Sequence, residues 1–355
     1  MKKVLTILIF LVVSILIILG GLYMWYKKQL DTPTSDNGNI VEIEIEQGES
    51  VKEISVKLQA AGVIKSSDIF YIYIKLNVIA PKIQAGKFKI PQNLTITEVS
   101  DTIQKAAGND LWITIPEGLR VDEVAEKLDN FFLQEENTKF NKEEFLDMVQ
   151  NPDSYEFDSE LLSFKPEKKT LEGFLYPNTY SIKKDIKSQE LIELFITTLE
   201  NELAEKNLSI EAHNELSAYE VLTLASIIER EAREDEEKYM ISDILLKRLQ
   251  GKLDGIKLLQ VDATLLYEER DWSAVVTIAL KDKDSKYNTY MYTGLTPTPI
   301  CNPGVSSIKA AMNPEANEYL FYLHDPEGNI HYAKTNDQHV NNQRCFINKN
   351  SDYCL

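Results

Sequence analysis

The sequence predicts an α+β protein that begins with a transmembrane helix and ends in a mixed α+β domain. Three observations lead to this class. Val4–Tyr26 is a long apolar run, Val41–Glu46 alternates apolar and acidic side chains, and Leu222–Arg233 has apolar residues at helical spacing. The first pattern is typical of a membrane span, the second of a half-buried strand, and the third of a helix packed against a core.

The run Val4–Tyr26 contains no charged residue and is long enough to cross a bilayer. Lysine pairs flank it, and aromatic residues cluster at its C-terminal end as in an interfacial belt. A cleaved signal peptide has a shorter apolar run and a small-residue exit, so we expect an uncleaved anchor. We assign residues 1–28 to a cytoplasmic tip and anchor, and residues 29–40 to a polar linker.

The net charge of −18 argues against a nucleic-acid partner and against broad adhesion to anionic lipid. Membrane attachment must therefore come from the apolar run. The flanking lysines are nearly balanced and do not fix the orientation. A short N-terminal tail before a large acidic body favours a single-pass protein of the cell membrane, with the body outside the cytoplasm.

A strand, a tight turn and a helix occur twice in the sequence, 70 residues apart. The first copy begins at Val41, and the second covers residues 111–130. Between them, Gln84–Ile90 and Leu94–Ile103 predict a further strand and helix. The matched pairs are Ile43 and Ile113, Ile45 and Ile115, Gly48 and Gly118, Val51 and Val121, Ile54 and Val124, and Leu58 and Leu128.

Residues 41–108 resemble a LysM-like module, a small fold that binds amino-sugar polymers. The alternative is an α+β spacer that holds the next domain away from the membrane. Both interpretations stay open, because a fold does not by itself imply a function.

The next stretch alternates helices with irregular segments. Phe140–Gln150 and Ile186–Lys206 have helical patterns, Pro152–Lys169 is acidic and loop-like, and Leu171–Tyr180 is an aromatic-rich strand or extended loop. Residues 217–220 read Ser-x-x-Glu, a capping box that starts the following helix.

The helix over Leu222–Arg233 carries the candidate general acid. Glu229 and Glu231 fall on the two borders of its apolar stripe. Thr223 and Arg230 fall on the opposite side, facing water. A carboxyl group beside apolar side chains stays protonated to higher pH than one in water, which suits a general acid. The alternative is that both are solvated glutamates paired with arginines. The helical pattern does not choose between the two residues.

Downstream of a second helix, Asp235–Leu249, the sequence is dense in tyrosine, amide, hydroxyl, proline and glycine. These residues fall in 259–264 (LQVDAT) and 287–304. Sugar-binding clefts need flat aromatic faces and a rim of amide or hydroxyl groups, and prolines and glycines hold such loops in fixed shapes. A helix from Ser306 and a hairpin over residues 319–334 complete the pattern.

The order of these motifs resembles the YceG-like family of endolytic murein lytic transglycosylases. The segments LEGFLYPNTY, LASIIEREA, LQVDAT and YNTYMYTGLTPTPICNPG carry the resemblance. It implies cleavage of MurNAc–GlcNAc bonds within peptidoglycan glycan strands, with 1,6-anhydro-MurNAc ends formed without water. It also implies a partnership with cell-wall synthesis proteins, where such cuts would terminate nascent strands. The alternatives are a non-catalytic peptidoglycan-binding scaffold and a hydrolase that leaves reducing ends.

The resemblance assigns the catalytic role to Glu229, which would serve first as acid and then as base. It places the catalytic domain at residues 109–345, followed by a tail at residues 346–355. Supporting or substrate-binding roles fall to Glu231, Glu172, Gln260, Asp262, Tyr287, Asn288, Thr289 and Tyr290.

No metal or cofactor is expected. The four histidines lack metal-ligand spacing, and no nucleotide-binding or nucleophile-elbow motif occurs in a usable context. Cys345 and Cys354 are close enough in sequence to form a disulfide in an oxidising compartment. Together with Cys301 they are otherwise three free thiols, and both alternatives stay open.

Overall fold

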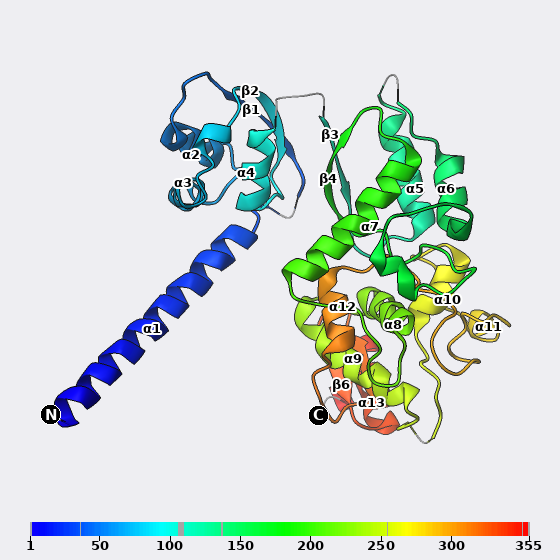
Figure 1. Cartoon of the computed structure of the whole chain (residues 1–355). Helices are drawn as coiled ribbons and strands as arrows, with labels where there is room; N and C mark the ends of the chain where they lie inside the picture. Colours follow the sequence, from blue (N-terminus) through cyan, green and yellow to red (C-terminus); the bar gives the residue numbers. More distant parts are fainter. Residues whose placement is uncertain are drawn as a thin grey trace. The chain divides into compact units, whose positions relative to one another are not determined.

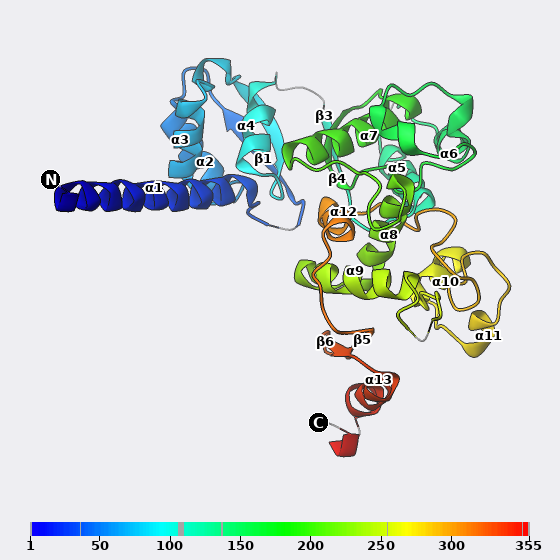
Figure 2. The same ribbon diagram turned by 60° about the horizontal axis from the view of Figure 1, so that its bottom comes forward.

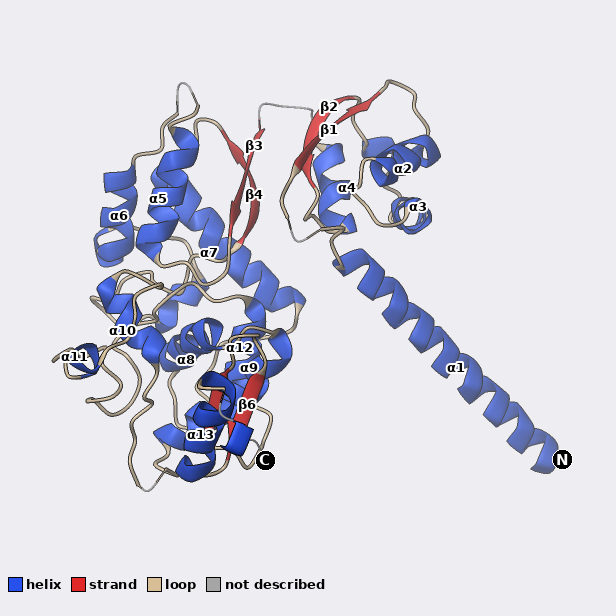
Figure 3. Cartoon of the chain, turned by 180° about the vertical axis from the view of Figure 1, so that it is seen from behind, coloured by secondary structure: helices blue, strands red, loops and turns tan. Residues whose placement is uncertain are grey.

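The computed structural model is a mixed α+β structure, which confirms the α+β part of the predicted class (Figures 1 and 3). It divides into two compact units. Unit 1 comprises Met1–Thr114 and Thr179–Lys183, and unit 2 comprises Ile115–Asn178 and Lys184–Leu355. The structure describes residues 2–35, 37–105, 110–135, 138–253, 255–349 and 351–353.

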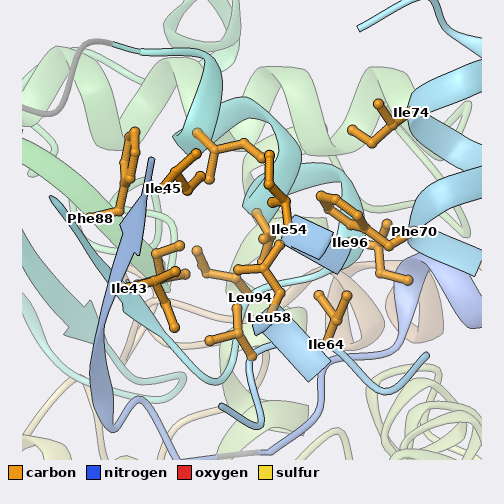
Figure 4. Close-up of a cluster of buried hydrophobic side chains, with 14 of the residues drawn as sticks. Ile43, Ile45, Ile54, Leu58, Ile64, Phe70, Ile74, Phe88, Leu94 and Ile96 are labelled. Atoms are coloured by element: carbon orange, nitrogen blue, oxygen red, sulfur yellow. The ribbon is translucent and has the colours of Figure 1, made fainter. Parts of the chain in front are cut away.

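Unit 1 packs helices against a two-stranded sheet. Strands β1 and β2 pair antiparallel, with Ile43 opposite Phe88. The inward side chains of this sheet meet the apolar faces of the helices in one core, which includes Leu58 and Phe70 (Figure 4). The elements are α1 (Lys2–Asp31), β1 (Ile40–Ile45), α2 (Val51–Ala60), α3 (Ser67–Leu76), the 3₁₀ turn η1 (Ala80–Lys82), β2 (Gly86–Pro91) and α4 (Ile96–Gln104).

Helix α1 contains the predicted anchor, Val4–Tyr26. Its C-terminal end packs on the core of unit 1 through Tyr26 and Leu30. Over the described residues, none of the helices combines the length and apolar character that crossing a membrane requires. The structure does not describe several side chains in the first half of α1, so the membrane anchor stays a prediction.

The repeated pattern gives a strand, a turn and a helix in both copies. Strands β1 and β3 (Asp110–Ile115) begin 70 residues apart, at 40 and 110, as do helices α2 and α5 (Val121–Phe132), at 51 and 121. Gly48 and Gly118 both have positive φ, 88° and 77°, a conformation that favours glycine. Strand β3 pairs with β4 (Asn178–Lys183) in a second sheet.

Unit 2 is mainly helical. Near its C-terminal end, α13 (Asn336–Asn342) packs against a hairpin of β5 (Phe321–His324) and β6 (Ile330–Ala333) (Figure 2). The predicted helix Asp235–Leu249 is present with the predicted bounds. Besides α5, the elements are α6 (Lys142–Gln150), the 3₁₀ turns η2 (Pro152–Ser154) and η3 (Glu160–Phe164), α7 (Ser188–Glu205), α8 (Ala218–Glu231), α9 (Asp235–Leu249), α10 (Asp262–Glu269), α11 (Ile278–Lys281), α12 (Val305–Met312), β5 (Phe321–His324), β6 (Ile330–Ala333), α13 (Asn336–Asn342), a π-helical turn η4 (Gln343–Ile347) and η5 (Ser351–Tyr353).

Helix α8 forms the centre of unit 2 and contacts α9, α10 and α12 (Figure 1). Its predicted capping box is confirmed: the Ser217 hydroxyl accepts from the Glu220 backbone N–H, and the Glu220 carboxylate accepts from that of Ser217. The expectation that Thr223 faces water is wrong. Because neighbours surround the helix, Thr223 is buried and its hydroxyl donates to the Tyr219 carbonyl.

Two further expectations are resolved by the fold. Most of Leu171–Tyr180 is irregular, and a strand begins only at Asn178. The cysteines are not three free thiols, because Cys345 is in a disulfide while Cys301 is free and buried. Cys354 lies outside the described residues.

Candidate active site

Glu229 lies near the C-terminal end of α8, where the buried helix reaches the edge of the core. Only 8% of its side chain is exposed. Its Oε2 accepts hydrogen bonds from the Gly304 backbone N–H at 3.0 Å and from the Ser307 hydroxyl at 2.7 Å. Gly304 is the N-cap of α12, and unpaired N–H groups at a helix N-terminus favour a negative charge. Two donors, one of them at a helix N-terminus, are therefore aimed at one oxygen of Glu229.

Lys238, on α9, is the cation of the site. Its Nζ lies 3.6 Å from Glu229 Oε2 and 2.8 Å from Asp235 Oδ1, and it donates to the Ser306 hydroxyl at 2.7 Å. Burial alone would lower the pKa of Lys238. The surrounding carboxylates, that of Glu229 first, outweigh burial and raise this pKa, so the ammonium group stays charged.

Glu117 brings a second carboxyl group to Glu229. It comes from the turn between β3 and α5, and its carboxyl lies 4.0 Å from Lys238 Nζ, the ammonium group that Glu229 also faces. Although 51% of the whole side chain is exposed, the carboxyl end faces these neighbours. Burial of this end, followed by the charge of Glu229, raises the pKa of Glu117 to about 7. A Cβ atom at Gly304 would overlap the Glu117 carboxyl, so any larger residue there would have to displace that carboxyl.

Asn302 holds together the chain segments that form the site. Its backbone pairs with the turn after β3: Gly118 N–H donates to the Asn302 carbonyl at 3.0 Å, and Asn302 N–H donates to the Leu119 carbonyl at 2.8 Å. Its side-chain oxygen accepts from the backbone N–H groups of Gly173 and Leu175 at 3.0 and 2.9 Å. Asn302 is completely buried, so these bonds fix the turn that carries Glu117.

Arg230 covers the other side of this turn. Its guanidinium lies 3.9 Å from the centre of the Trp272 ring, and Nη1 donates to the Gly118 carbonyl at 3.4 Å. A Cβ atom at Gly118 would lie 3.0 Å from Arg230 Nη1. The expectation of a water-facing arginine is therefore wrong here, because Trp272 provides a stacking surface.

Glu172 is completely buried and does not reach solvent. Its carboxylate accepts from the backbone N–H of Val121, the first residue of α5, at 3.0 Å, and from the Tyr267 hydroxyl at 3.1 Å. Burial raises the pKa of Glu172 to about 8, although both hydrogen bonds act in the opposite direction. In this position Glu172 anchors the start of α5.

Three of the sequence-predicted residues form a second group. The Tyr322 hydroxyl donates to Glu231 at 2.6 Å, and the Tyr290 hydroxyl donates to Asp262 at 2.5 Å. Burial and then the charge of Asp262 raise the pKa of Glu231 to about 7. Lys281 Nζ lies 3.4 Å from Asp262. The structure therefore brings Glu231, Asp262 and Tyr290 together.

The other predicted residues shape the loops around this group. Asn288 is completely buried and donates to the carbonyls of Lys281 and Lys283, both at 2.8 Å. Thr289 is buried, and its hydroxyl accepts from the Val261 N–H at 3.0 Å.

Gln260 and Tyr287 retain some exposure. The Gln260 side chain is exposed, and its backbone N–H donates to the Thr289 carbonyl at 3.0 Å. Tyr287 is half-buried, and its ring centre lies 5.0 Å from that of Tyr267.

The sequence reasoning missed Glu117, Lys238, Gly304 and Ser307. Two local signals could have found some of them: a glutamate directly before the glycine of a repeated turn, and an Asn-Pro-Gly before a helix start. Lys238 has no such signal, since it stands among charged residues at a helix start. In the described part of the chain, no group of three or more His, Cys, Asp or Glu side chains is arranged to hold a metal ion.

Comparisons with known proteins agree on one family. The model of the YceG-like family matches residues 43–345. The endolytic murein transglycosylase of Bacillus subtilis is 30% identical to the chain over 343 residues, which are 95% of this chain and 93% of that protein. That of Streptococcus pneumoniae is 28% identical over 367 residues, covering 96% of this chain and 64% of that protein. A crystal structure of a yceG-like protein from Listeria monocytogenes is similar with a TM-score of 0.51 and 28% identity, over 85% of this chain and 99% of that one.

Proposed function

This chain belongs to the YceG-like family, and from that premise we propose that it is an endolytic lytic transglycosylase of peptidoglycan. It would cleave MurNAc–GlcNAc bonds within glycan strands and leave 1,6-anhydro-MurNAc ends. The names of the Bacillus and Streptococcus relatives support this activity. The observation that carries the proposal is the environment of Glu229, a carboxylate at the edge of a buried helix with donors aimed at one oxygen.

The chemistry needs one group that gives a proton and later takes one back. Protonated Glu229 would donate to the glycosidic oxygen while the bond from C1 to that oxygen breaks. The positive charge at C1 would be eased by the N-acetyl group of the substrate or by nearby polar groups. Ionised Glu229 would then remove the proton from the O6 hydroxyl as O6 bonds to C1. No water enters the products.

The donors around Glu229 fit the step in which its charge develops. As the proton leaves, negative charge appears on a carboxyl already faced by Gly304 N–H, the Ser307 hydroxyl and the Lys238 ammonium. These groups are held in place by α12 and α9 and need no reorientation during the reaction. Preorganised donors of this kind stabilise a transition state more than water does.

The predicted supporting residues divide into two roles in this proposal. Glu231, Asp262, Tyr290, Gln260 and Tyr287 would contact the sugar, because each has at least part of its side chain at the surface. Glu172, Asn288 and Thr289 are buried and would act by fixing α5 and the loops that carry those residues.

The cellular setting also belongs to the proposal. An N-terminal anchor at residues 1–28 would hold the enzyme in the cell membrane, with its catalytic domain (residues 109–345) outside the cytoplasm. Residues 41–108 would act as the LysM-like module between them. From there, cuts in nascent strands would terminate their growth beside the cell-wall synthesis proteins.

The test is digestion of uncrosslinked glycan strands, with mass spectrometry of the fragments. We expect the full chain to release internal fragments with anhydro ends, and Glu229→Gln to release none. Glu236→Gln, which removes a charge from an exposed position in the first turn of α9, is the matched control and should act like wild type. Reducing ends would indicate a hydrolase, and no cleavage by wild type would indicate a binding protein.

A further inference from the structure

We propose that Glu117 is a positioning residue that shares one proton with Glu229 and keeps this carboxyl pair protonated for the reaction. The inference deepens the proposed function and rests on it. It concerns a residue in a different part of the sequence from the helix that carries Glu229.

The geometry makes the two carboxyl groups one unit. Both lie within reach of one ammonium group, with Lys238 Nζ 3.6 Å from Glu229 and 4.0 Å from Glu117. Both also meet at Gly304, whose N–H donates to Glu229 Oε2 and whose Cβ position, were there a side chain, would overlap the Glu117 carboxyl. A hydrogen bond between two carboxyl groups requires a proton on one of them. Glu229 Oε2 already accepts two hydrogen bonds from the protein, and the proton that the pair shares is the one that Glu229 passes to the substrate.

The charges facing the pair favour one retained proton. From α9, Lys238 contributes a positive charge and Asp235 a negative one. From α8, Arg230 lies against the turn of Glu117, but its Nη1 is occupied by the Gly118 carbonyl. Two neighbouring carboxyl groups beside a single ammonium group do not both ionise readily, and burial of the Glu117 carboxyl adds to that cost.

The shared proton suits both steps of the reaction. In the first step the pair gives its proton to the leaving glycosidic oxygen through Glu229, and the bond from C1 to that oxygen breaks. Glu117 and Glu229 are then both ionised, beside Lys238. In the second step the O6–H proton returns to the pair as O6 bonds to C1. The pair ends with the same number of protons, and no other reactant is consumed.

The fold shows that the turn does not need a carboxyl group at this position. In the first copy of the repeat, residue 47, which matches residue 117, is a glutamine before Gly48. Both turns have glycine in the positive-φ region and a glutamate at the third position of the following helix, Glu53 in one copy and Glu123 in the other. Glu117→Gln is therefore expected to fold.

The experiment measures kcat and KM of the full chain on glycan strands from pH 4.5 to pH 8.5. For Glu117→Gln we expect kcat at pH 7 to fall at least about tenfold with KM within about twofold, as for loss of acid–base assistance. On the high-pH side of the profile, kcat declines as the acid loses its proton. This decline should occur about one pH unit or more lower in the variant, because a single carboxyl no longer shares its proton. Glu117→Asp should recover part of kcat.

A second variant tests the contact rather than the charge. Gly304→Ala places a Cβ atom where the Glu117 carboxyl lies, so it should displace Glu117 and shift the pH profile in the same direction. Glu236→Gln should leave the profile unchanged. If the wild type is active and both Glu117→Gln and Gly304→Ala keep the wild-type pH profile, the inference is overturned while the proposed function stands. A wild type that releases no fragments would overturn the proposed function, and the inference with it.

Discussion

The buried carboxyl group of Glu172 gives the sharpest prediction about stability. Its pKa is raised from an ordinary value of 4.5 to about 8, first because burial disfavours the charge. A carboxyl whose pKa is raised by folding stabilises the folded state at low pH, and this contribution is lost as pH rises through the folded value. The window for Glu172 therefore runs from about pH 4.5 to about pH 8.

The magnitude follows from the linkage between protons and folding. Each pKa unit corresponds to about 1.4 kcal/mol, so the full shift corresponds to about 5 kcal/mol. Between pH 5.5 and pH 8.5 the wild type should lose about 3 kcal/mol of unfolding free energy through this group. Glu172→Gln does not titrate, and its amide oxygen can still accept from the Val121 N–H. The variant should show no such loss.

The assay is urea unfolding followed by tryptophan fluorescence. Replacing Trp25 and Trp112 by phenylalanine leaves Trp272, in unit 2, as the reporter. We expect the unfolding free energy of this parent chain, relative to that of its Glu172→Gln variant, to fall by about 3 kcal/mol from pH 5.5 to pH 8.5. Glu236→Gln, measured in the same background, should differ from its parent by a constant amount. A constant difference for Glu172→Gln as well would refute the reasoning.

Three further predictions concern single hydrogen-bonding groups. Asn302→Ala should lower the unfolding free energy by about 3–5 kcal/mol in the same urea assay, because several buried backbone groups lose their partner. A loss below about 1 kcal/mol would contradict the view that Asn302 holds these chain segments together. Ser307→Ala should lower kcat on glycan strands about tenfold without changing KM, since a donor to Glu229 is removed, and Ser307→Thr should retain most activity. Tyr322→Phe should destabilise by about 1 kcal/mol more at pH 8 than at pH 5.5, because its hydroxyl favours the ionised form of Glu231, whose pKa is about 7; an equal effect at both pH values would show that this bond does not depend on the charge.

Much of the fold could be predicted from local patterns, because those patterns are what form the elements. The capping box at Ser217 and the bounds of α9 follow from residues adjacent in sequence. The repeat predicts where β3 and α5 begin. The orientation of Thr223 could not be predicted in this way, because a helix covered on every side leaves its polar residues buried as well. Local periodicity does not reveal how many neighbours a helix will have.

The candidate site could be predicted only in part, because its contacts join distant segments. Glu229 and Glu231 stand out on one helix, but the choice between them depends on what faces each carboxyl. Glu117 lies 112 residues before Glu229, and its proximity arises from pairing between its turn and Asn302. Glu172 has a suitable residue type within a family motif, yet its burial gives it a structural role.

The repeat separates what the fold requires at this turn from what the site requires. Both copies need glycine at the turn, because Gly48 and Gly118 have positive φ, and both place a glutamate that caps the next helix. They differ at the residue before the glycine, which is Gln47 in one copy and Glu117 in the other. Both side chains are partly exposed, but the carboxyl end of Glu117 lies 4.0 Å from Lys238 Nζ, which also faces Glu229. Since the same turn forms with an amide, the carboxyl of Glu117 is explained by its neighbours in the site.

Exchanging the two residues, Gln47→Glu together with Glu117→Gln, keeps the composition and net charge. This double variant should therefore fold as wild type, measured by urea unfolding, and lose activity as Glu117→Gln alone does. Full activity in that variant would place the role of the carboxyl outside the site.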